Sequence, residues 1–166
     1  MDIQKMSIEE ILGLALVTEI HGRKFYESLA LKVSHPEVKR KISALAEDEG
    51  RHQKLMENLY RAILKKEPQQ LPDKGVPDIL KAISSLEINN KTQVLQVLDM
   101  AIEAEVIATK FYHRGAFIAT DSKTRQVFEE LEREEDSHFQ YLTAEKAALS
   151  GDLYWFSIGD SAMMEE

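Results

Sequence analysis

The feature that most constrains this 166-residue chain is an internal repeat. A shift of 86 residues, without a gap, aligns residues 12–52 with residues 98–138 and gives ten identities in 41 positions. The same offset holds through two predicted helices and the loop between them. It therefore predicts two equivalent helical hairpins, each too small to bury its apolar face alone.

Helix start and stop signals divide the chain into four long helices. We expect them over about residues 7–33, 36–66, 90–119 and 122–150, with a short helix at about 78–88. Ser7 and Glu10 form a capping box at the first start, and Gly151 supplies a stop signal after the last helix. The other start signals are Pro36, Asn90, and either Asp121 or Ser122.

The lengths of the links predict the topology. Short loops join the first helix to the second and the third to the fourth, whereas a crossover over about residues 67–89 separates the two pairs. This spacing predicts an all-α fold, a four-helix bundle made of two antiparallel hairpins joined by one long crossover. We assign residues 1–151 to the bundle and residues 152–166 to a C-terminal tail.

The apolar stripe of each predicted helix is broken at its centre by a glutamate, and in the second and fourth helices also by a histidine one turn later. These interrupting residues are Glu19, Glu49, His52, Glu105, Glu135 and His138. Glu19 and Glu49 each lie 15 residues from position 34, and Glu105 and Glu135 each lie 15 residues from position 120. Because antiparallel helices rise equally, all six side chains should meet at one level.

Four carboxylates inside a bundle need positive charge, since each desolvated charge costs at least several kcal/mol. Two divalent ions would balance the four negative charges, and oxygen ligands with imidazole suit iron or manganese. We therefore predict a dimetal site in which Glu19 and Glu105 are terminal ligands. Glu49 and Glu135 are predicted to bridge the two ions.

Four further residues lie on the same stripes near this predicted site. Tyr26 and Tyr112 each lie seven residues after a glutamate that has no histidine one turn later. These two glutamates, Glu19 and Glu105, are called the lone glutamates below. We expect each tyrosine to donate a hydrogen bond to a bridging carboxylate from the facing hairpin. Gly22 and Ala108 lie opposite the site, where they either leave room for a small oxidant or allow close helix packing.

Composition excludes several other functions. The chain has no cysteine, which rules out disulfides, cysteine-bound zinc and iron–sulfur clusters. The net charge of −8 argues against binding duplex nucleic acid, which needs a basic surface. No apolar run is long enough to cross a membrane, and we find no secretion signal, so we expect a cytoplasmic protein without nucleic-acid or membrane partners.

With these residues the sequence resembles the ferritin-like superfamily, and within it the rubrerythrin branch, over about residues 8–150. The resemblance implies a di-iron centre, held by the six residues above, that reacts with hydrogen peroxide or dioxygen in defence against oxidative stress. Rubrerythrins proper also carry a rubredoxin domain with four cysteines, which this chain lacks. They usually have a second glutamate where this chain has Ala108, so its six-residue set is equally similar to bacterioferritin.

Several functional alternatives therefore stay open. The chain is either a di-iron oxidoreductase or a ferroxidase and iron-storage protein, and a metal-free helical interaction module is the third reading. The electrons come either from an external donor or from ferrous iron itself. We expect a homodimer rather than a shell, and we expect the aromatic tail, with Tyr154, Trp155 and Phe156, to dock on the bundle or on a second subunit.

Overall fold

A computed structural model of the chain describes residues 3–33, 36–76 and 91–150. Four long helices follow the short 3-10 helix η1 (Ile3–Lys5). They are α1 (Ile8–Lys32), α2 (Pro36–Leu64), α4 (Lys91–Ile118) and α5 (Ser122–Ser150). The described residues contain no strand, so the all-α prediction is confirmed. The predicted short helix at 78–88, the Asn90 cap and the tail at 152–166 lie outside the described residues.

The helix ends match the capping signals in the sequence. The Ser7 side chain accepts a hydrogen bond from the backbone N–H of Glu10, whose carboxylate accepts one from the Ser7 N–H, completing the capping box. Asp121, rather than Ser122, caps α5, because its Oδ1 accepts the Thr124 N–H at 2.7 Å. Helix α2 ends two residues before the predicted Lys66, where Lys65 has a positive φ of 56°.

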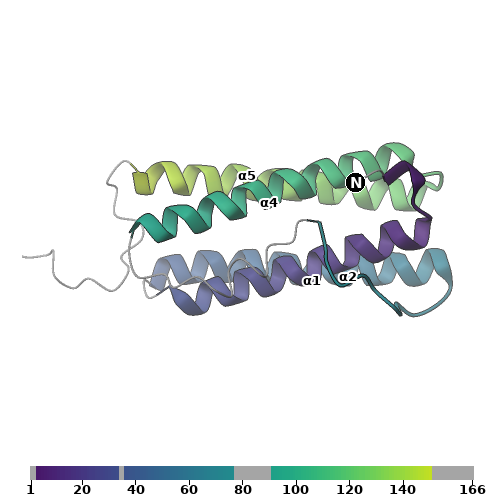
Figure 1. Cartoon of the computed structure of the whole chain (residues 1–166), viewed down its shortest axis with the longest axis horizontal. Coiled ribbons are helices and arrows are strands. Elements are labelled where there is room, and N and C mark those ends of the chain that lie inside the picture. The colour runs from purple at the N-terminus through teal and green to yellow at the C-terminus, as the bar shows by residue number, and fades with distance from the viewer. Residues whose placement is uncertain (1–2, 34–35, 77–90, 151–166) are drawn as a thin grey trace, which may run out of the picture.

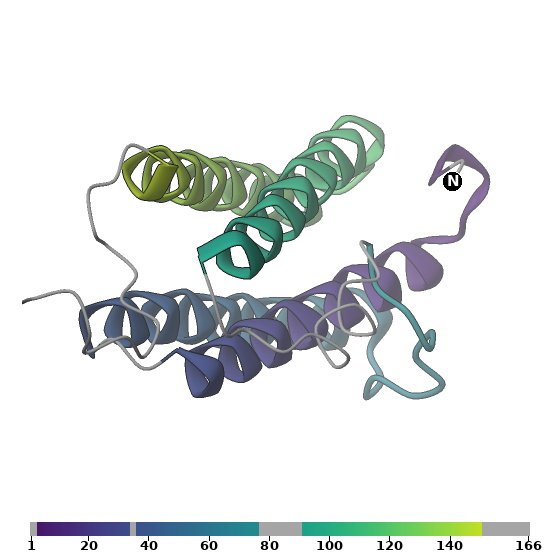
Figure 2. The ribbon, with the colours of Figure 1, turned by 60° about the vertical axis from the view of Figure 1, so that its left-hand side comes forward.

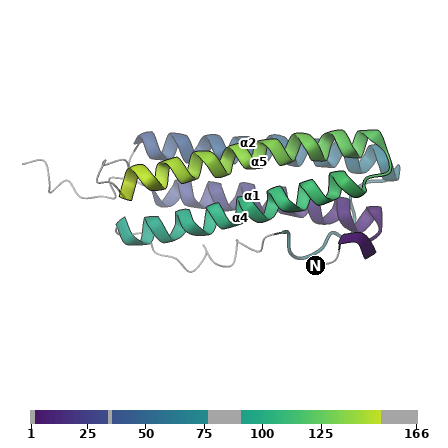
Figure 3. The same ribbon diagram turned by 90° about the horizontal axis from the view of Figure 1, so that it is seen from above.

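The helices form two antiparallel hairpins in two layers, α1 beside α2 and α4 beside α5 (Figure 1). Figure 2 separates the two layers clearly, and Figure 3 shows α4 over α1 and α5 over α2. Helix α2 ends at the opposite end of the bundle from the start of α4, so the two hairpins are joined by one long crossover. This arrangement is the predicted four-helix bundle with one crossover. No helix within the described ranges has an apolar stretch long enough to cross a membrane.

Two separate apolar clusters fill the interior of the bundle. One contains Phe25, Leu29, Ile42 and Leu98, and the other contains Leu12, Leu16, Met56 and Phe128, among further buried residues. The six polar residues singled out in the sequence lie on the helix turns between these clusters and are buried as well. The apolar core is therefore interrupted by one polar layer near mid-bundle.

The start of the crossover packs closely on α1 beside this layer. The backbone N–H of Val76 donates to Thr18 Oγ1 at 2.7 Å, and that hydroxyl donates to the Leu14 carbonyl. A Cβ atom at Gly75 would lie 2.7 Å from the Thr18 Cα, so only glycine permits this approach. Residues 75–76 are thereby held against the turn of α1 that precedes Glu19.

We expect Gly75→Ala to lower the free energy of unfolding by about 1 to 3 kcal/mol, because the added methyl group pushes the crossover off α1. The matched control is Gly13→Ala in the interior of α1. Its Cβ would meet only Pro72 Cδ and Leu71 Cδ2, at 3.6 and 3.7 Å, so that variant should gain about 0.5 to 1 kcal/mol from helix propensity. Urea denaturation measures both, and equal effects of the two variants would contradict the close contact.

Candidate metal centre

Each long helix contributes one glutamate to the polar layer, and α2 and α5 each add a histidine three residues later. These are the six residues predicted from the sequence, and none of their exposed fractions exceeds 6%. Residues three apart lie on the same helix face, so Glu49 and His52 point together into the bundle, as do Glu135 and His138. The structure therefore brings all six predicted residues into one buried cluster.

The cluster divides into two overlapping groups, each with donor atoms within 4.8 Å of one another. One group is Glu19, Glu49, His52 and Glu135, and the other is Glu49, Glu105, Glu135 and His138. Glu49 and Glu135 belong to both groups, whereas each lone glutamate belongs to one. This arrangement can hold two cations side by side with two carboxylates in common.

Both imidazole rings turn the same nitrogen toward the carboxylates. His52 Nδ1 lies 3.2 Å from both Glu19 Oε2 and Glu135 Oε1. His138 Nδ1 lies 3.3 Å from Glu49 Oε1 and from Glu135 Oε2. The two rings stack with centroids 5.6 Å apart. The Nδ1 atoms therefore face the interior of the cluster, on the side where the carboxylates converge.

Three of these buried atoms make no hydrogen bond to any part of the chain that the structure describes. They are His52 Nδ1, His138 Nδ1 and Glu19 Oε2, whose neighbours are close but not in hydrogen-bond geometry. Buried polar atoms normally have a hydrogen-bond partner, so two ring nitrogens and one carboxylate oxygen without one, all in the same place, need an explanation. A metal ion in each group would use these atoms, and the residues present therefore fit a dimetal centre.

Burial is the main cause of a raised pKa at three of the four carboxyls, those of Glu19, Glu49 and Glu105. The nearby negative charge of Glu135 raises the same three pKa values further. Both effects penalise the charged form of the side chain. Without a cation these three carboxyls are therefore driven to bind protons.

The two imidazoles have the opposite influence on Glu135. Burial alone would raise the pKa of Glu135, but His138 and His52 outweigh it and lower that pKa. Burial alone would lower the pKa of each histidine, but Glu135 and other cluster carboxylates outweigh it and raise both histidine pKa values. In the absence of metal, protons thus take the place of part of the missing positive charge.

Tyr26 and Tyr112 form a reciprocal pair of hydrogen bonds between the hairpins. The Tyr26 hydroxyl on α1 donates to Glu105 Oε1 on α4, and the Tyr112 hydroxyl on α4 donates to Glu19 Oε1 on α1. The acceptors lie on the facing hairpin, as expected, but they are the lone glutamates rather than Glu49 or Glu135. The physical reason is that α4 lies over α1, so a tyrosine on one of these helices reaches the glutamate of the other (Figure 3).

Two acidic residues that the sequence analysis missed contact the Nε2 atoms of the histidines, the ring nitrogens other than the Nδ1 atoms that face the cluster. His52 Nε2 lies 2.7 Å from Glu134 Oε2, and His138 Nε2 lies 3.5 Å from Asp48 Oδ2. Each acid sits four residues before the histidine of its own helix, and the 86-residue offset relates the two positions. That offset was the available signal, but the change from Asp to Glu hid it from a search for identities.

Arg51 links these two acids at the α2–α5 surface. Its guanidinium lies 2.6 Å from Asp48 Oδ1 and 3.5 Å from Glu134 Oε2. Because a carboxylate can only accept, each acid favours a hydrogen on Nε2 of the histidine it contacts, which leaves Nδ1 free to bind a cation. The three surface residues therefore orient both imidazoles toward the cluster.

A small cavity of about 20 Å³ adjoins the cluster on the α1–α4 side. Gly22, Thr18, Ala104 and Ala108 line it together with cluster carboxylates. A Cβ atom at Gly22 would lie 2.7 Å from Glu49 Oε2, so glycine here lets that carboxylate approach α1. Both expected roles of Gly22 are therefore present, close packing and a bordering space about the size of one water molecule.

The raised carboxyl pKa values predict how the stability of the metal-free protein depends on pH. A folded-state pKa above the unfolded value gives stability that is complete below the unfolded pKa and is lost as pH rises through the folded pKa. For Glu19, Glu49 and Glu105 this means a free energy of unfolding that decreases over the pH window above their ordinary pKa, from about pH 5 upward. The lowered pKa of Glu135 adds a constant over that window, because both its pKa values lie below it.

Urea denaturation in the presence of a chelator measures this dependence. The double variant Glu19→Gln, Glu105→Gln should make the slope shallower, since glutamine does not titrate and only Glu49 of the three raised carboxyls remains. The exposed pair Glu47→Gln, Glu103→Gln serves as the control and should leave the slope unchanged. A free energy of unfolding that rises over the same window in the unsubstituted protein would contradict the assignment.

The contact at Gly22 predicts an asymmetric response to substitution at two repeat-equivalent positions. Gly22→Ala should weaken binding of divalent manganese by about tenfold or more, because Glu49 must move away from the cluster. Ala108→Gly, its counterpart 86 residues on, adds no atom and should bind as many ions as the unsubstituted protein. Calorimetric titration with Mn²⁺ compares them, and unimpaired binding by Gly22→Ala would refute the steric role.

The comparisons with known proteins agree with this geometry. A sequence model of the rubrerythrin family matches residues 10–146, a range that includes all six cluster residues. A solved structure titled as a hypothetical protein from Pyrococcus furiosus is 30% identical, with a TM-score of 0.81, and the match covers 90% of this chain and 96% of that one. The search of curated proteins gave no match. Because the family match runs through all four helices, the chain belongs to the rubrerythrin family, with its ferritin-like di-iron fold.

Proposed function

We propose that the buried cluster binds two iron ions and that the protein is a di-iron oxidoreductase that reduces hydrogen peroxide or dioxygen. The observation that carries this proposal is the convergence of four carboxylates and two imidazole nitrogens on one buried layer, with three donor atoms lacking hydrogen bonds to the described residues. Carboxylate oxygen and imidazole are ligands that suit iron, and manganese would use the same set.

The two overlapping groups define which residues would hold each ion. Glu19, Glu49, His52 and Glu135 would hold one, and Glu49, Glu105, Glu135 and His138 the other. We assign Glu49 and Glu135 as bridging ligands because both groups contain them, and Glu19 and Glu105 as terminal ligands. When bound, an iron pair supplies one electron from each ferrous ion and acts as a Lewis acid.

The two tyrosines hold the proposed terminal ligands in place. Burial is the main cause that raises the pKa of both Tyr26 and Tyr112 well above the ordinary value, and the acceptor carboxylates Glu105 and Glu19 add to it. Each hydroxyl therefore keeps its hydrogen at neutral pH and donates it to a glutamate. Each hydrogen bond fixes one carboxylate oxygen and leaves the other available for a cation.

The surroundings of the cluster favour a small oxidant. Apolar clusters close the bundle on both sides of the polar layer, and the adjoining cavity of about 20 Å³ has room for one water-sized molecule. Hydrogen peroxide and dioxygen are of about that size, whereas an organic substrate is not. The same enclosure excludes bulk water from the reacting atoms.

A ferroxidase that prepares iron for storage is the second candidate. It is favoured by Ala108, which lines the cavity at the position where rubrerythrins usually have a second glutamate. The described cluster therefore has only four glutamates and two histidines, a set that is equally similar to bacterioferritin. In that case ferrous iron itself is the electron source, whereas the first candidate needs a separate donor. Storage within its own cage also requires a large shell, whereas we propose a homodimer near 38 kDa (2 × 19.0 kDa).

An anaerobic ferrous titration followed separately by peroxide and by dioxygen tests the proposed function. We expect two ferrous ions per chain, then a ferric charge-transfer absorbance after oxidant. Each peroxide takes up two electrons and two protons and yields two waters. Glu49→Gln should lose binding at both positions, because both groups contain Glu49, whereas the exposed Glu47→Gln on the same helix should behave as the unsubstituted protein.

The same experiment distinguishes the alternatives. Two bound irons that neither oxidant converts to the ferric form would overturn the redox proposal. Ferric iron accumulating well beyond two ions per chain, in a particle much larger than a dimer, would favour storage. No metal binding, with Glu49→Gln leaving the free energy of unfolding unchanged, would favour the metal-free interaction module.

A further inference from the structure

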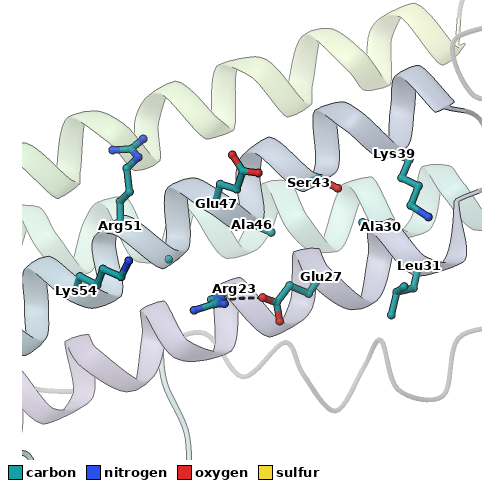
Figure 4. A pocket seen from close by; sticks show the side chains of 11 residues that line it. Arg23, Glu27, Ala30, Leu31, Lys39, Ser43, Ala46, Glu47, Arg51 and Lys54 are labelled. Atoms are coloured by element: carbon teal, nitrogen blue, oxygen red, sulfur yellow. Dashed lines mark hydrogen bonds and ion pairs between the residues drawn. The ribbon is translucent and has the colours of Figure 1, made fainter.

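A long groove on the outside of the first hairpin has no part in the proposed chemistry. Its volume is about 630 Å³ between α1 and α2, and the residues that line it include the small residues Ala46 and Gly50. Figure 4 shows the labelled side chains around it, from both helices. Four cationic side chains line it, those of Arg23, Lys39, Arg51 and Lys54. We call this feature the basic groove.

The charge of the basic groove is opposite to that of the whole chain. Its four cations face only two acidic lining residues, Glu27 and Glu47, in a protein with a net charge of −8. Arg23 pairs with Glu27 and Arg51 with Asp48, at 2.7 and 2.6 Å. Lys39 and Lys54 have no ion pair with any residue that the structure describes, so two cations are available to an acidic partner.

The groove also offers an apolar contact. Leu31 lines it and is 80% exposed, one of the three large hydrophobic side chains exposed among the described residues. Figure 4 shows Leu31 on α1 at the same end of the groove as Lys39. A single exposed leucine is common on protein surfaces, but one beside a hollow and a cation favours an amphipathic occupant.

The chain itself contains a segment of complementary chemistry. Residues 152–166 include four acidic residues and no basic one. Between the first two acids, Asp152 and Asp160, lies the run Leu-Tyr-Trp-Phe-Ser-Ile. The segment thus combines negative charge, which is complementary to the cations of the basic groove, with apolar side chains that can contact Leu31.

The segment also starts at the correct end of the bundle. Glu145 near the end of α5 forms an ion pair with Lys41 near the start of α2, at 3.0 Å, and Leu149 shares an apolar cluster with Val38. The end of α5 therefore lies beside the start of α2, where Lys39 is. From Lys39 to Lys54 the groove spans about 22 Å of helix, and fifteen extended residues reach about 50 Å, so the segment is long enough.

We propose that residues 152–166 dock in the basic groove of the same chain, with the aromatic run over Leu31 and the acidic residues facing Lys39 and Lys54. This inference is independent of the proposed function, since it invokes neither the metal nor the oxidant. Docking would tie the chain beyond α5 to the α1–α2 hairpin and cover the outer surface of α2 at Gly50, the residue that follows Glu49.

Trp155 makes the proposal directly measurable because it is the only tryptophan in the chain. We expect blue-shifted Trp155 emission and weak quenching by acrylamide in the unsubstituted protein. The variant Lys39→Glu, Lys54→Glu should shift the emission to the red and increase quenching. Leu31→Ser should have the same direction of effect, and it should not disturb folding because the side chain is 80% exposed.

The matched control is Lys110→Glu, Lys123→Glu, which makes the same charge change at two exposed lysines on α4 and α5. It should leave Trp155 emission unchanged. An equal effect of control and groove variants, or strong quenching in the unsubstituted protein, would overturn the proposal. So would protection of Trp155 that appears only as the protein concentration and the mass in solution rise together, because the segment would then occupy a second copy.

Discussion

The cost of burying four carboxylates in the middle of a helical bundle governs most of what this structure shows. Each desolvated charge costs at least several kcal/mol unless positive charge is nearby. The nearest positive groups in the polar layer are His52 and His138, but burial and the charge of Glu135 outweigh them and raise the pKa values of three carboxyls. Two divalent ions would satisfy the carboxylates fully, and the orphaned Nδ1 atoms face the place where they would bind.

The internal repeat explains how one chain builds a site with two nearly equivalent halves. Each hairpin supplies three residues of one group, and the other hairpin completes that group with Glu135 or Glu49. The tyrosine hydrogen bonds are crossed in the same way, from Tyr26 to Glu105 and from Tyr112 to Glu19. The halves nevertheless differ, because Gly22 admits a carboxylate where its counterpart Ala108 has a methyl group. Arg51, which contacts the acids at both histidines, has Ser137 as its counterpart. Such differences would allow the two similar groups to bind their ions with unequal affinity.

Sequence periodicity predicted the helices and the six cluster residues because the rise of a helix is fixed, so counting residues gives height. Periodicity did not predict which side chains of neighbouring helices contact each other, because that depends on how the helices are arranged around the bundle. The tyrosine acceptors were therefore misassigned, and the contacts of Asp48 and Glu134 with the histidines were missed. The approach of Gly75 to Thr18 depends on the path of the crossover, which no period encodes. The reaction itself is not determined by the ligand set, because peroxidase and ferroxidase chemistry use similar residues.

The most direct test of the central claim is a crystal structure of the iron-loaded protein with anomalous diffraction measured on both sides of the iron absorption edge. The account predicts two iron peaks inside the bundle, one in each four-residue group, with Glu49 and Glu135 touching both. Tyr26 and Tyr112 should still contact Glu105 and Glu19. A single peak, or iron bound only at the surface with no ion among the six residues, would contradict it.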